Sequence, residues 1–532
     1  MLRKEHVDKT NVLSPPRAAP LDHDFRGANP IVQSRRGFLR KVAQNEWGLA
    51  FILLALDIAA WVACYSAASY LRDEAFGETP GQLFGVGAIE LVVVFAAIFI
   101  IGGYNRDDKR TLSYTTEHML ALIAAALVSA VLIYSAAAYG AAIKPSRAVF
   151  AVTFLAFTAL SIAYRRLVHR FFAASIAHRA FLVVGSGEIA AEFYRAYRTS
   201  PNRQRLEFVD IERQRIGEHI AGPGTPIIEG DLATKLANLG DRYSGVILAE
   251  RVDRLKPELL ERLVRTQFHH ARVYTLEGFY EAHWKHVPVS SIDPFWPLQM
   301  GFQLAQMSPY HYLKRLFDIV FSAVCLVLCS PLLALITLLV WWQNGRPALF
   351  RQERVGREGQ LFTILKFRTM GVNCGMRNAD SGTGTNALND EARVYSAIRD
   401  PHSAFPDEDD IYTRANDPRV TKLGRWLRKL RLDELPQLWN VLRGDMSLIG
   451  PRAEWNRCAE RYEKKIPFYH FRHLVKPGIT GWAQVNYPYG ESDEDALEKL
   501  KYDLYYIRRY SLKLDAMIVL KTVHTMLFAR GR

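Results

Sequence analysis

The chain has few cysteines, and they are not arranged to hold a disulfide framework or a zinc ion. Five cysteines are spread over 532 residues, and none forms a Cys-x-x-Cys pair. The sequence also lacks a helix-turn-helix, zinc finger or other nucleic-acid module that would use its formal charge of +14. We therefore expect a protein of a reducing compartment, with lipid headgroups and phosphates rather than nucleic acid as its anionic partners.

The first 45 residues lack a long apolar run and do not have the pattern of a secretory signal peptide. Arg35 and Arg36 form a twin arginine, but the apolar run that follows is long enough to span a membrane and has no A-x-A cleavage site. We interpret residues 1–45 as a disordered cytoplasmic N-terminus that precedes a membrane anchor.

Four apolar runs lie within residues 46–172, and each is long enough to cross a bilayer, which takes roughly 20 residues. They are Trp47–Leu71, Gln82–Tyr104, His118–Ala142 and Ala148–Tyr164. Lys and Arg gather before the first run, between the second and third, and after the fourth. Since basic loops stay in the cytoplasm, this pattern predicts a four-helix transmembrane bundle with both ends in the cytosol. Polar residues within the runs are few, which argues against a transporter subunit or a scaffold.

Residues 173–305 show the alternation of short apolar strands and helices that is typical of a Rossmann-like α/β domain. Ala180–Val184 is a strand candidate, and the glycine turn Gly185-Ser-Gly187-Glu-Ile-Ala190 follows it. Gly245–Ala249 and Ala271–Thr275 are further strand candidates. One glycine turn is weak evidence of a ligand, so a bound nucleotide and a structural or regulatory domain remain equal alternatives.

The apolar segment 316–342 opens the last domain, residues 306–532. Ser330-Pro331 interrupts it near the middle, where a proline removes a helix hydrogen bond, and Asp318 lies near its start. Both flanks are basic, so a helix that crossed the membrane would place one basic cluster outside. We expect a re-entrant helix that bends at Ser330-Pro331 and returns to the cytoplasmic face; a kinked spanning helix is the alternative. A polar insertion, residues 373–410, interrupts the rest of this membrane-bound cytosolic domain.

A basic amphipathic helix and a pair of carboxylates follow the insertion. The apolar positions of the helix recur at helical spacing and suit either an anionic membrane surface or a protein core: Leu423, Trp426, Leu427 and Leu430. Asp433 and Glu434 come next, between apolar residues and just after a run of cations. By residue type alone a helix N-cap explains Asp433 best, with metal binding or nucleophilic chemistry as the alternative.

A series of motifs along residues 311–532 changes that balance. They are Lys314-Arg-Leu-Phe-Asp318, Ser330-Pro331, Phe350-Arg-Gln-Glu-Arg-Val-Gly356, Lys366-Phe-Arg-Thr-Met370, Asn416-Asp-Pro-Arg419, Leu432-Asp-Glu-Leu-Pro-Gln437, Gly444-Asp-Met-Ser447, Gly450-Pro-Arg452 and Lys476-Pro-Gly-Ile-Thr-Gly481. In type and order they resemble the bacterial sugar transferase family, the monotopic polyprenyl-phosphate hexose-1-phosphate transferases. The bundle and the Rossmann-like domain resemble the long members of that family.

The resemblance implies a two-step transfer. Asp433 would be the nucleophile that attacks the β-phosphorus of a UDP-sugar, giving an aspartyl-phosphosugar intermediate and UMP, and undecaprenyl phosphate would then accept the sugar phosphate. Glu434 would hold Mg²⁺, and Pro451-Arg452 would recognise the nucleotide. Other substrate-binding residues, by motif position, are Lys366, Arg368 and Arg428, with Lys314, Arg315 and Asp318 for the lipid phosphate. Ser330 and Pro331 would be structural. Ala453 departs from the family, where a second proline is common, and puts the local loop geometry in doubt.

The resemblance also implies a setting. The enzyme would act at the bacterial inner membrane, with its catalytic domain on the cytoplasmic face, in the first membrane step of exopolysaccharide or capsule synthesis. The long architecture favours UDP-glucose as donor, with galactose or another UDP-sugar as the alternative, and a homodimer is left open. A competing class is a membrane-anchored nucleotide-sugar dehydratase or epimerase, which would use the glycine turn and the pair Tyr310 and Lys314.

Overall fold

The computed structural model describes residues 46–527 apart from fifteen short or long segments. These segments are 73–79, 106–111, 139–145, 177–178, 201–203, 231, 238–241, 251–254, 270–271, 292–295, 297–301, 303–307, 372–418, 488–489 and 491. The N-terminal region 1–45 and the insertion 373–410 therefore lie outside the described residues.

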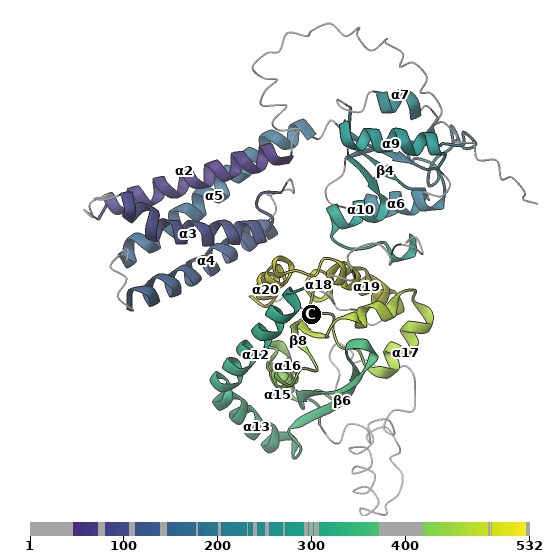
Figure 1. The fold of residues 1–532 in the computed structure, drawn as a ribbon. Helices are drawn as coiled ribbons and strands as arrows, with labels where there is room; N and C mark the ends of the chain where they lie inside the picture. Colours follow the sequence, from purple (N-terminus) through teal and green to yellow (C-terminus); the bar gives the residue numbers. More distant parts are fainter. Residues whose placement is uncertain are drawn as a thin grey trace, which may run out of the picture.

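The first four described helices pack side by side (Figure 1). They are α2 (Glu46–Tyr70), α3 (Pro80–Ile100), α4 (Leu112–Ala138) and α5 (Arg147–Ile176). Three of them are long and apolar enough to cross a membrane, at Gly48–Tyr70, Tyr114–Ser135 and Arg147–Arg170. The described part of α3 that meets the apolar test is shorter, Ile89–Ile100. The helices match the four predicted runs in position, and the chain has the apolar spans of a membrane protein.

A five-stranded parallel sheet follows, in the order β3-β2-β1-β4-β5. Its strands are β1 (Ala180–Val184), β2 (Arg205–Val209), β3 (Ile228–Glu229), β4 (Tyr243–Leu248) and β5 (Arg272–Thr275). Helices α6 (Glu188–Thr199) and α10 (Leu276–Phe279) cover one face, and α7 (Leu232–Ala237) and α9 (Pro257–His269) the other (Figure 1). The sequence predicted β1, β4 and β5 but missed β2 and β3.

The glycine turn after β1 has a structural explanation. Gly185 has a φ of +132°, and a Cβ there would lie 2.6 Å from the carbonyl oxygen of Ala249. Only glycine meets both demands, because β1 and the end of β4 approach closely at that point. The first glycine of the turn is therefore required by the sheet itself, and its presence carries no information about a ligand.

The apolar segment predicted at 316–342 forms two helices, α12 (Tyr310–Leu328) and α13 (Ser330–Asn344), which are bent by 62°. Pro331 lies in the first turn of α13, where its missing N–H costs nothing. The hydroxyl of Ser330 donates a 2.7 Å hydrogen bond to the carbonyl of Val327 and satisfies a carbonyl that the break leaves open. The predicted break at Ser330-Pro331 is therefore present in the structure.

The remaining elements form a mixed domain, and α12 and α13 lie along one side of it (Figure 1). They are the hairpin β6 (Leu349–Val355) and β7 (Leu361–Phe367), helices α15 (Lys422–Lys429) and α16 (Gln437–Arg443), the parallel pair β8 (Ser447–Ile449) and β9 (Gly478–Thr480), and helices α17 (Asn456–Lys465), α18 (Trp482–Asn486), α19 (Asp493–Arg508) and α20 (Leu512–Leu527). The apolar stripe predicted on α15 divides: Leu427 is buried, whereas Trp426 and Leu430 are 62% and 52% exposed. One face of α15 thus packs on the core, and the other face is exposed.

Candidate active site

The two carboxylates stand on a short 3₁₀ turn, Leu432–Glu434, between α15 and α16. Arg431 precedes it in the left-handed region, with a φ of 58°, and turns the chain sharply at the end of α15. Helix α16 begins later, with Pro436 at its N-cap position and no side-chain cap. The prediction that Asp433 caps this helix is therefore wrong, because the 3₁₀ turn holds it outside the helix.

Glu434 is buried among cations. Its Oε1 lies 3.1 Å from Nζ of Lys366 and 3.7 Å from Nη2 of Arg452, and its side chain is 11% exposed. Burial by itself would raise the pKa of Glu434, but Lys366, Arg452 and Arg431 outweigh it and lower that pKa to about 2. Glu434 is consequently ionised throughout the physiological pH range.

Asp433 has the opposite electrostatic environment. Burial and the neighbouring charge of Glu434 raise the pKa of Asp433, against the opposing effects of Lys366 and Arg428. Within the described part of the chain, its Oδ1 is buried and has no hydrogen-bond partner. A buried carboxylate oxygen without a partner costs free energy, so its persistence points to a ligand or a reaction. Adjacent carboxyls with pKa values pushed apart are typical of sites that divide chemical roles.

Asn440, a residue that the sequence analysis did not single out, fixes Lys366 opposite Glu434. Its side chain, 1% exposed on α16, accepts a 3.0 Å hydrogen bond from the backbone N–H of Leu365 and donates a 2.8 Å bond to the carbonyl of Thr363. These bonds join α16 to β7. The role of Asn440 follows from the packing of α16 against β7, which the sequence alone does not show.

Arg452 reaches the site from a tightly built loop after β8. The N–H of Gly478 donates to the carbonyl of Pro451 at 2.8 Å, and a Cβ on Gly478 would lie 2.1 Å from the nitrogen of Gly450. Glycine at that position allows the β8 and β9 backbones to approach closely and places Pro451-Arg452 beside Glu434. Ala453, the departure from the family pattern, is 5% exposed and packs in the core.

Two further arginines complete the cationic surroundings, and the sequence analysis did not place them in the site. Arg431 lowers the pKa of Glu434, and Arg354 on β6 lowers the pKa of the buried Lys366. Arg354 lies within the motif Phe350–Gly356 and could have been found there. Arg431 lies near Glu434 because its left-handed backbone turns the chain at that point, which the sequence does not reveal. The predicted Arg428 lies on α15, where its Nε donates to the Thr369 hydroxyl at 2.9 Å.

Arg368, predicted to bind a phosphate, has other contacts. Its guanidinium donates to the carbonyls of Asn344, Pro347 and Met370, at 2.5, 3.3 and 3.3 Å. Asn344 is the last residue of α13, so Arg368 caps the end of that helix. This contact fastens α13 to the strand that carries Lys366.

The three residues predicted at the mouth of the bent helix also face the domain. The ammonium of Lys314 lies 2.5 Å from Asp515 and 2.8 Å from the Tyr506 hydroxyl. Arg315 donates to the carbonyls of Val441 and Leu442 at 2.6 and 2.8 Å, and Asp318 accepts from the N–H of Leu448 at 3.0 Å. Each fastens α12 to the domain. Tyr310, which would pair with Lys314 in a dehydratase or epimerase, bonds to the same Asp515 at 2.5 Å.

The site's carboxylates could hold a magnesium ion only if substrate phosphates completed the coordination. Among the described residues there is no group of three or more His, Cys, Asp or Glu side chains that could hold a metal by themselves. Mg²⁺ is, however, commonly held by one or two carboxylates together with phosphate oxygens and water. The unpartnered Oδ1 of Asp433 beside the ionised Glu434 fits this donor set.

The structure thus places two adjacent carboxylates beside Lys366 and Arg452, on a domain that also carries the bent apolar helix pair α12–α13. Residues 309–529 match the model of a family described as bacterial sugar transferase. This region of the chain is similar to the bacterial sugar transferase family, the resemblance that its motifs predicted.

Similar proteins are named for related transfers. The chain is 36% identical over 290 residues to a UDP-N-acetylgalactosamine-undecaprenyl-phosphate N-acetylgalactosaminephosphotransferase of Aeromonas hydrophila, across 54% of this chain and 60% of the relative. It is 41% identical over 215 residues to the UDP-glucose:undecaprenyl-phosphate glucose-1-phosphate transferase of Escherichia coli strain K12, across 40% of this chain and 39% of the relative. It is 37% identical over 223 residues to an undecaprenyl-phosphate galactose phosphotransferase of Salmonella typhimurium, across 41% of each chain. The matches thus span 39% to 60% of these relatives' lengths.

Proposed function

We propose that this protein transfers a hexose 1-phosphate from a UDP-sugar to undecaprenyl phosphate at the cytoplasmic face of a bacterial inner membrane. The observation that carries the proposal is the carboxylate pair: Asp433 with a buried, unpartnered oxygen beside Glu434, ionised within a cluster of cations. The relatives' names supply the substrate class.

Asp433 acts as the nucleophile. Its carboxylate oxygen forms a bond to the β-phosphorus of the UDP-sugar, and the bond from that phosphorus to the bridging oxygen breaks. The electron pair leaves with UMP, and the sugar phosphate stays on Asp433 as an acyl phosphate. An oxygen of undecaprenyl phosphate then attacks the same phosphorus, and the carboxylate of Asp433 is released. The two-step route suits one substrate from solution and one from the bilayer.

The cations around the pair stabilise the charge that this transfer moves. Lys366 and Arg452 already lie against Glu434, so phosphate oxygens arriving beside Asp433 meet positive charge held in place by β7 and the Pro451-Arg452 loop. Mg²⁺ held by Glu434 would supply further neutralisation of the diphosphate. The charge of Arg428 on α15 opposes the rise in the pKa of Asp433 that burial and Glu434 cause, which favours the ionised nucleophile.

We assign the donor as UDP-glucose, on the likeness of the long architecture to glucose-transferring family members. The relatives are named for glucose, galactose and N-acetylgalactosamine, so galactose is the second candidate. Such a product would begin an exopolysaccharide or capsule repeat on its lipid carrier.

Trapping the intermediate tests the reaction. The purified chain is incubated with Mg²⁺ and UDP-glucose, UDP-galactose or UDP-N-acetylgalactosamine that carries the label in the β-phosphate, without acceptor. We expect one donor to leave label on the protein with one equivalent of UMP, and undecaprenyl phosphate to remove it. Asp433→Asn should not be labelled. UMP release that needs the acceptor and never labels the protein would refute the covalent step.

The α12–α13 pair serves this reaction as a re-entrant helix. A spanning helix has ends roughly 30 Å apart on opposite sides of the bilayer. Here Arg315 bonds α12 to α16, and Arg368 caps the end of α13, so one domain holds both ends. Val327 and Leu328 at the bend are each 72% exposed, as expected for the part inserted most deeply in lipid.

Labelling from outside the cell tests this topology. Arg346→Cys, in a background without other cysteines, should react with an impermeant maleimide only after the cells are opened. Lys144→Cys, in the loop predicted to face outward, is the matched control and should react in intact cells. Reaction of both in intact cells would mean that the segment spans.

A further inference from the structure

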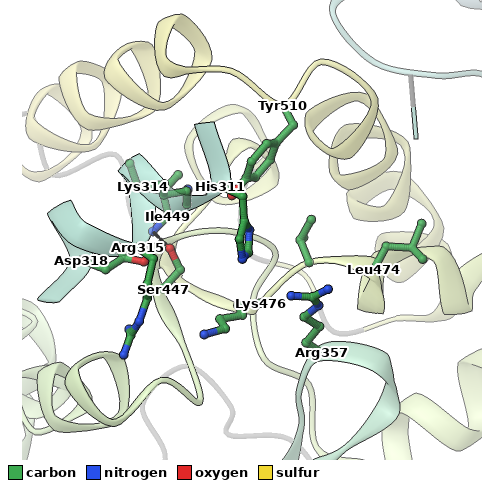
Figure 2. A pocket seen from close by; sticks show the side chains of 11 residues that line it. His311, Lys314, Arg315, Asp318, Arg357, Ser447, Ile449, Leu474, Lys476 and Tyr510 are labelled. Atoms are coloured by element: carbon green, nitrogen blue, oxygen red, sulfur yellow. Dashed lines mark hydrogen bonds between the residues drawn. The ribbon is translucent and has the colours of Figure 1, made fainter. Parts of the chain in front are cut away.

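A second cationic site, a pocket, lies at the N-terminal end of α12 (Figure 2). Four cations, His311 and a single carboxylate line it: Lys314, Arg315, Arg357, Lys476, His311 and Asp318. Figure 2 shows the side chains of His311, Arg357 and Lys476 around one space, although they come from α12, the turn after β6 and the segment before β9. Only the fold brings them together.

Part of the pocket's positive charge lacks an acidic partner. Lys314 is neutralised by Asp515, and the guanidinium of Arg315 is satisfied by two backbone carbonyls. Lys476 makes no hydrogen bond or ion pair within the described residues. Burial and the charges of Arg315 and Arg357 lower the pKa of Lys476, against the opposing charges of Asp318 and Asp445.

Arg357 is incompletely satisfied as well. Its Nε lies 3.1 Å from Glu358 but makes no hydrogen bond of good geometry within the described part of the chain, and it is buried. The one carboxylate that lines the pocket, Asp318, is held by the N–H of Leu448. Arg357 and Lys476 therefore have unused hydrogen-bond donors that an anion in this space could accept from.

The pocket is separate from the carboxylate site. Arg315 and Lys476 approach Gly444, just beyond the end of α16, where a Cβ would lie 3.1 Å from Nη2 of Arg315 and 3.6 Å from Nζ of Lys476. Asp433 and Glu434 precede the start of the same helix. At 1.5 Å per residue, α16 alone separates the two sites by roughly 10 Å. A phosphate group bound here would thus not be in contact with Asp433.

The position on α12 indicates where the anion comes from. Tyr312 and Leu313, next to His311, are 79% and 54% exposed, and the exposed apolar face continues through Leu316 and Phe317. The opposite face, with Lys314 and Asp318, is buried in the domain. The pocket therefore lies level with the point where the apolar surface of the helix begins, which is where lipid headgroups lie when the helix is inserted.

We propose that this pocket binds the phosphate group of a membrane lipid through Lys476 and Arg357. This binding anchors the domain to the membrane at the N-terminal end of α12. The lipid's acyl chains lie along the exposed face of that helix. The binding is independent of sugar-phosphate transfer and needs neither UDP-sugar nor Asp433.

The test measures ligand binding by the delipidated, full-length chain in detergent, from the shift of its thermal unfolding midpoint. Three probes are titrated: short-chain phosphatidic acid, the matching diacylglycerol without phosphate, and inorganic phosphate. We expect phosphatidic acid to bind at least tenfold more tightly than either of the others. Equal affinity for inorganic phosphate would overturn the lipid assignment, and equal affinity for diacylglycerol would overturn the phosphate assignment.

Variants locate the binding. The pair Lys476→Ala and Arg357→Ala should weaken phosphatidic acid at least tenfold, whereas Lys464→Ala with Arg457→Ala, an exposed pair of the same charge on α17, should not. Arg452→Ala should retain the binding; if it loses the binding while the pocket variant keeps it, the lipid occupies the carboxylate site and the proposal is wrong. Should the alanine pair unfold, Lys476→Gln with Arg357→Gln replaces it.

Discussion

Asp57 in the helix bundle and Asp433 in the C-terminal domain both have a buried carboxylate oxygen and an arginine nearby, and their environments differ in one decisive way. Both oxygens of Asp57 are occupied: Arg165 donates to them at 2.8 and 2.6 Å, and the hydroxyls of Tyr104 and Tyr164 donate as well. Asp433 keeps a buried oxygen that has no partner among the described residues, and it shares its surroundings with a second carboxylate.

This difference is the one expected between a structural ion pair and the chemical site that we propose at Asp433. Asp57 and Arg165 are both fully buried, and their hydrogen bonds join α2 to α5 inside the bundle. Every lone pair used there contributes to holding the helices together. At Asp433 the fold leaves hydrogen-bonding capacity unused, which costs stability and leaves room for a phosphate, a metal or both. Substitutions at the two aspartates should therefore have opposite signatures.

The largest effect is expected for Asp433→Asn. Loss of the nucleophile should lower the rate of UMP release by about 10⁴-fold or more, the scale seen when a covalent nucleophile is removed. The unfolding midpoint should stay the same or rise, because the unpartnered charge is gone. Turnover within tenfold of the wild type would show that Asp433 is not the nucleophile.

Asp57→Asn should show the reverse pattern. Breaking a buried ion pair while its partner stays buried costs about 3–5 kcal/mol, so the bundle should lose thermal stability in detergent. Turnover per folded molecule should stay close to that of the wild type. Equal stability of the two proteins would contradict a structural role for the pair. The double variant Asp57→Asn with Arg165→Met should recover part of the loss.

Arg452 and Arg368 sharpen the comparison among cations. Arg452→Ala should lower kcat/KM for the UDP-sugar by about 10²-fold, because its guanidinium lies at the carboxylates. Arg368→Ala should instead cost about 1–3 kcal/mol of stability, since it removes charged hydrogen bonds to the end of α13. Initial rates and thermal unfolding of both variants separate these roles; a KM effect confined to Arg368→Ala would reverse them.

The smallest effect concerns pH. Asp433 must be ionised to attack, so activity falls as the pH drops through its pKa. Lys366 lowers that pKa, and its removal should move the acid limb of kcat/KM to higher pH. Lys366→Met tests this, with Arg368→Met as the matched control, whose acid limb should not move. An unchanged limb in Lys366→Met would mean that another group sets it.

Much of the fold was predictable because its signals are local. Apolar runs long enough to span, the break at Ser330-Pro331 and the strand before Gly185 all depend on residues close in sequence, and each appears in the structure. The short strands β2 and β3 were missed because few residues carry their pattern. The family motifs predicted a chemical role for Asp433 and Glu434, whereas residue type alone favoured a helix cap.

By itself the sequence determined the apolar helices and the bent segment, and it predicted the carboxylate pair Asp433 and Glu434 as the chemical centre. Only the tertiary structure decided which of the predicted cations lie beside that pair and which have other partners, because the partners are distant in sequence: Lys366 meets Glu434 across 68 residues, and Lys314 meets Asp515 across 201. Motif position assigned Arg368 and Lys314 to substrate, yet packing gives them a helix end and a buried aspartate as partners. The sequence gives the charge of a side chain, but whether that charge is paired in the folded protein depends on which residues the fold places beside it.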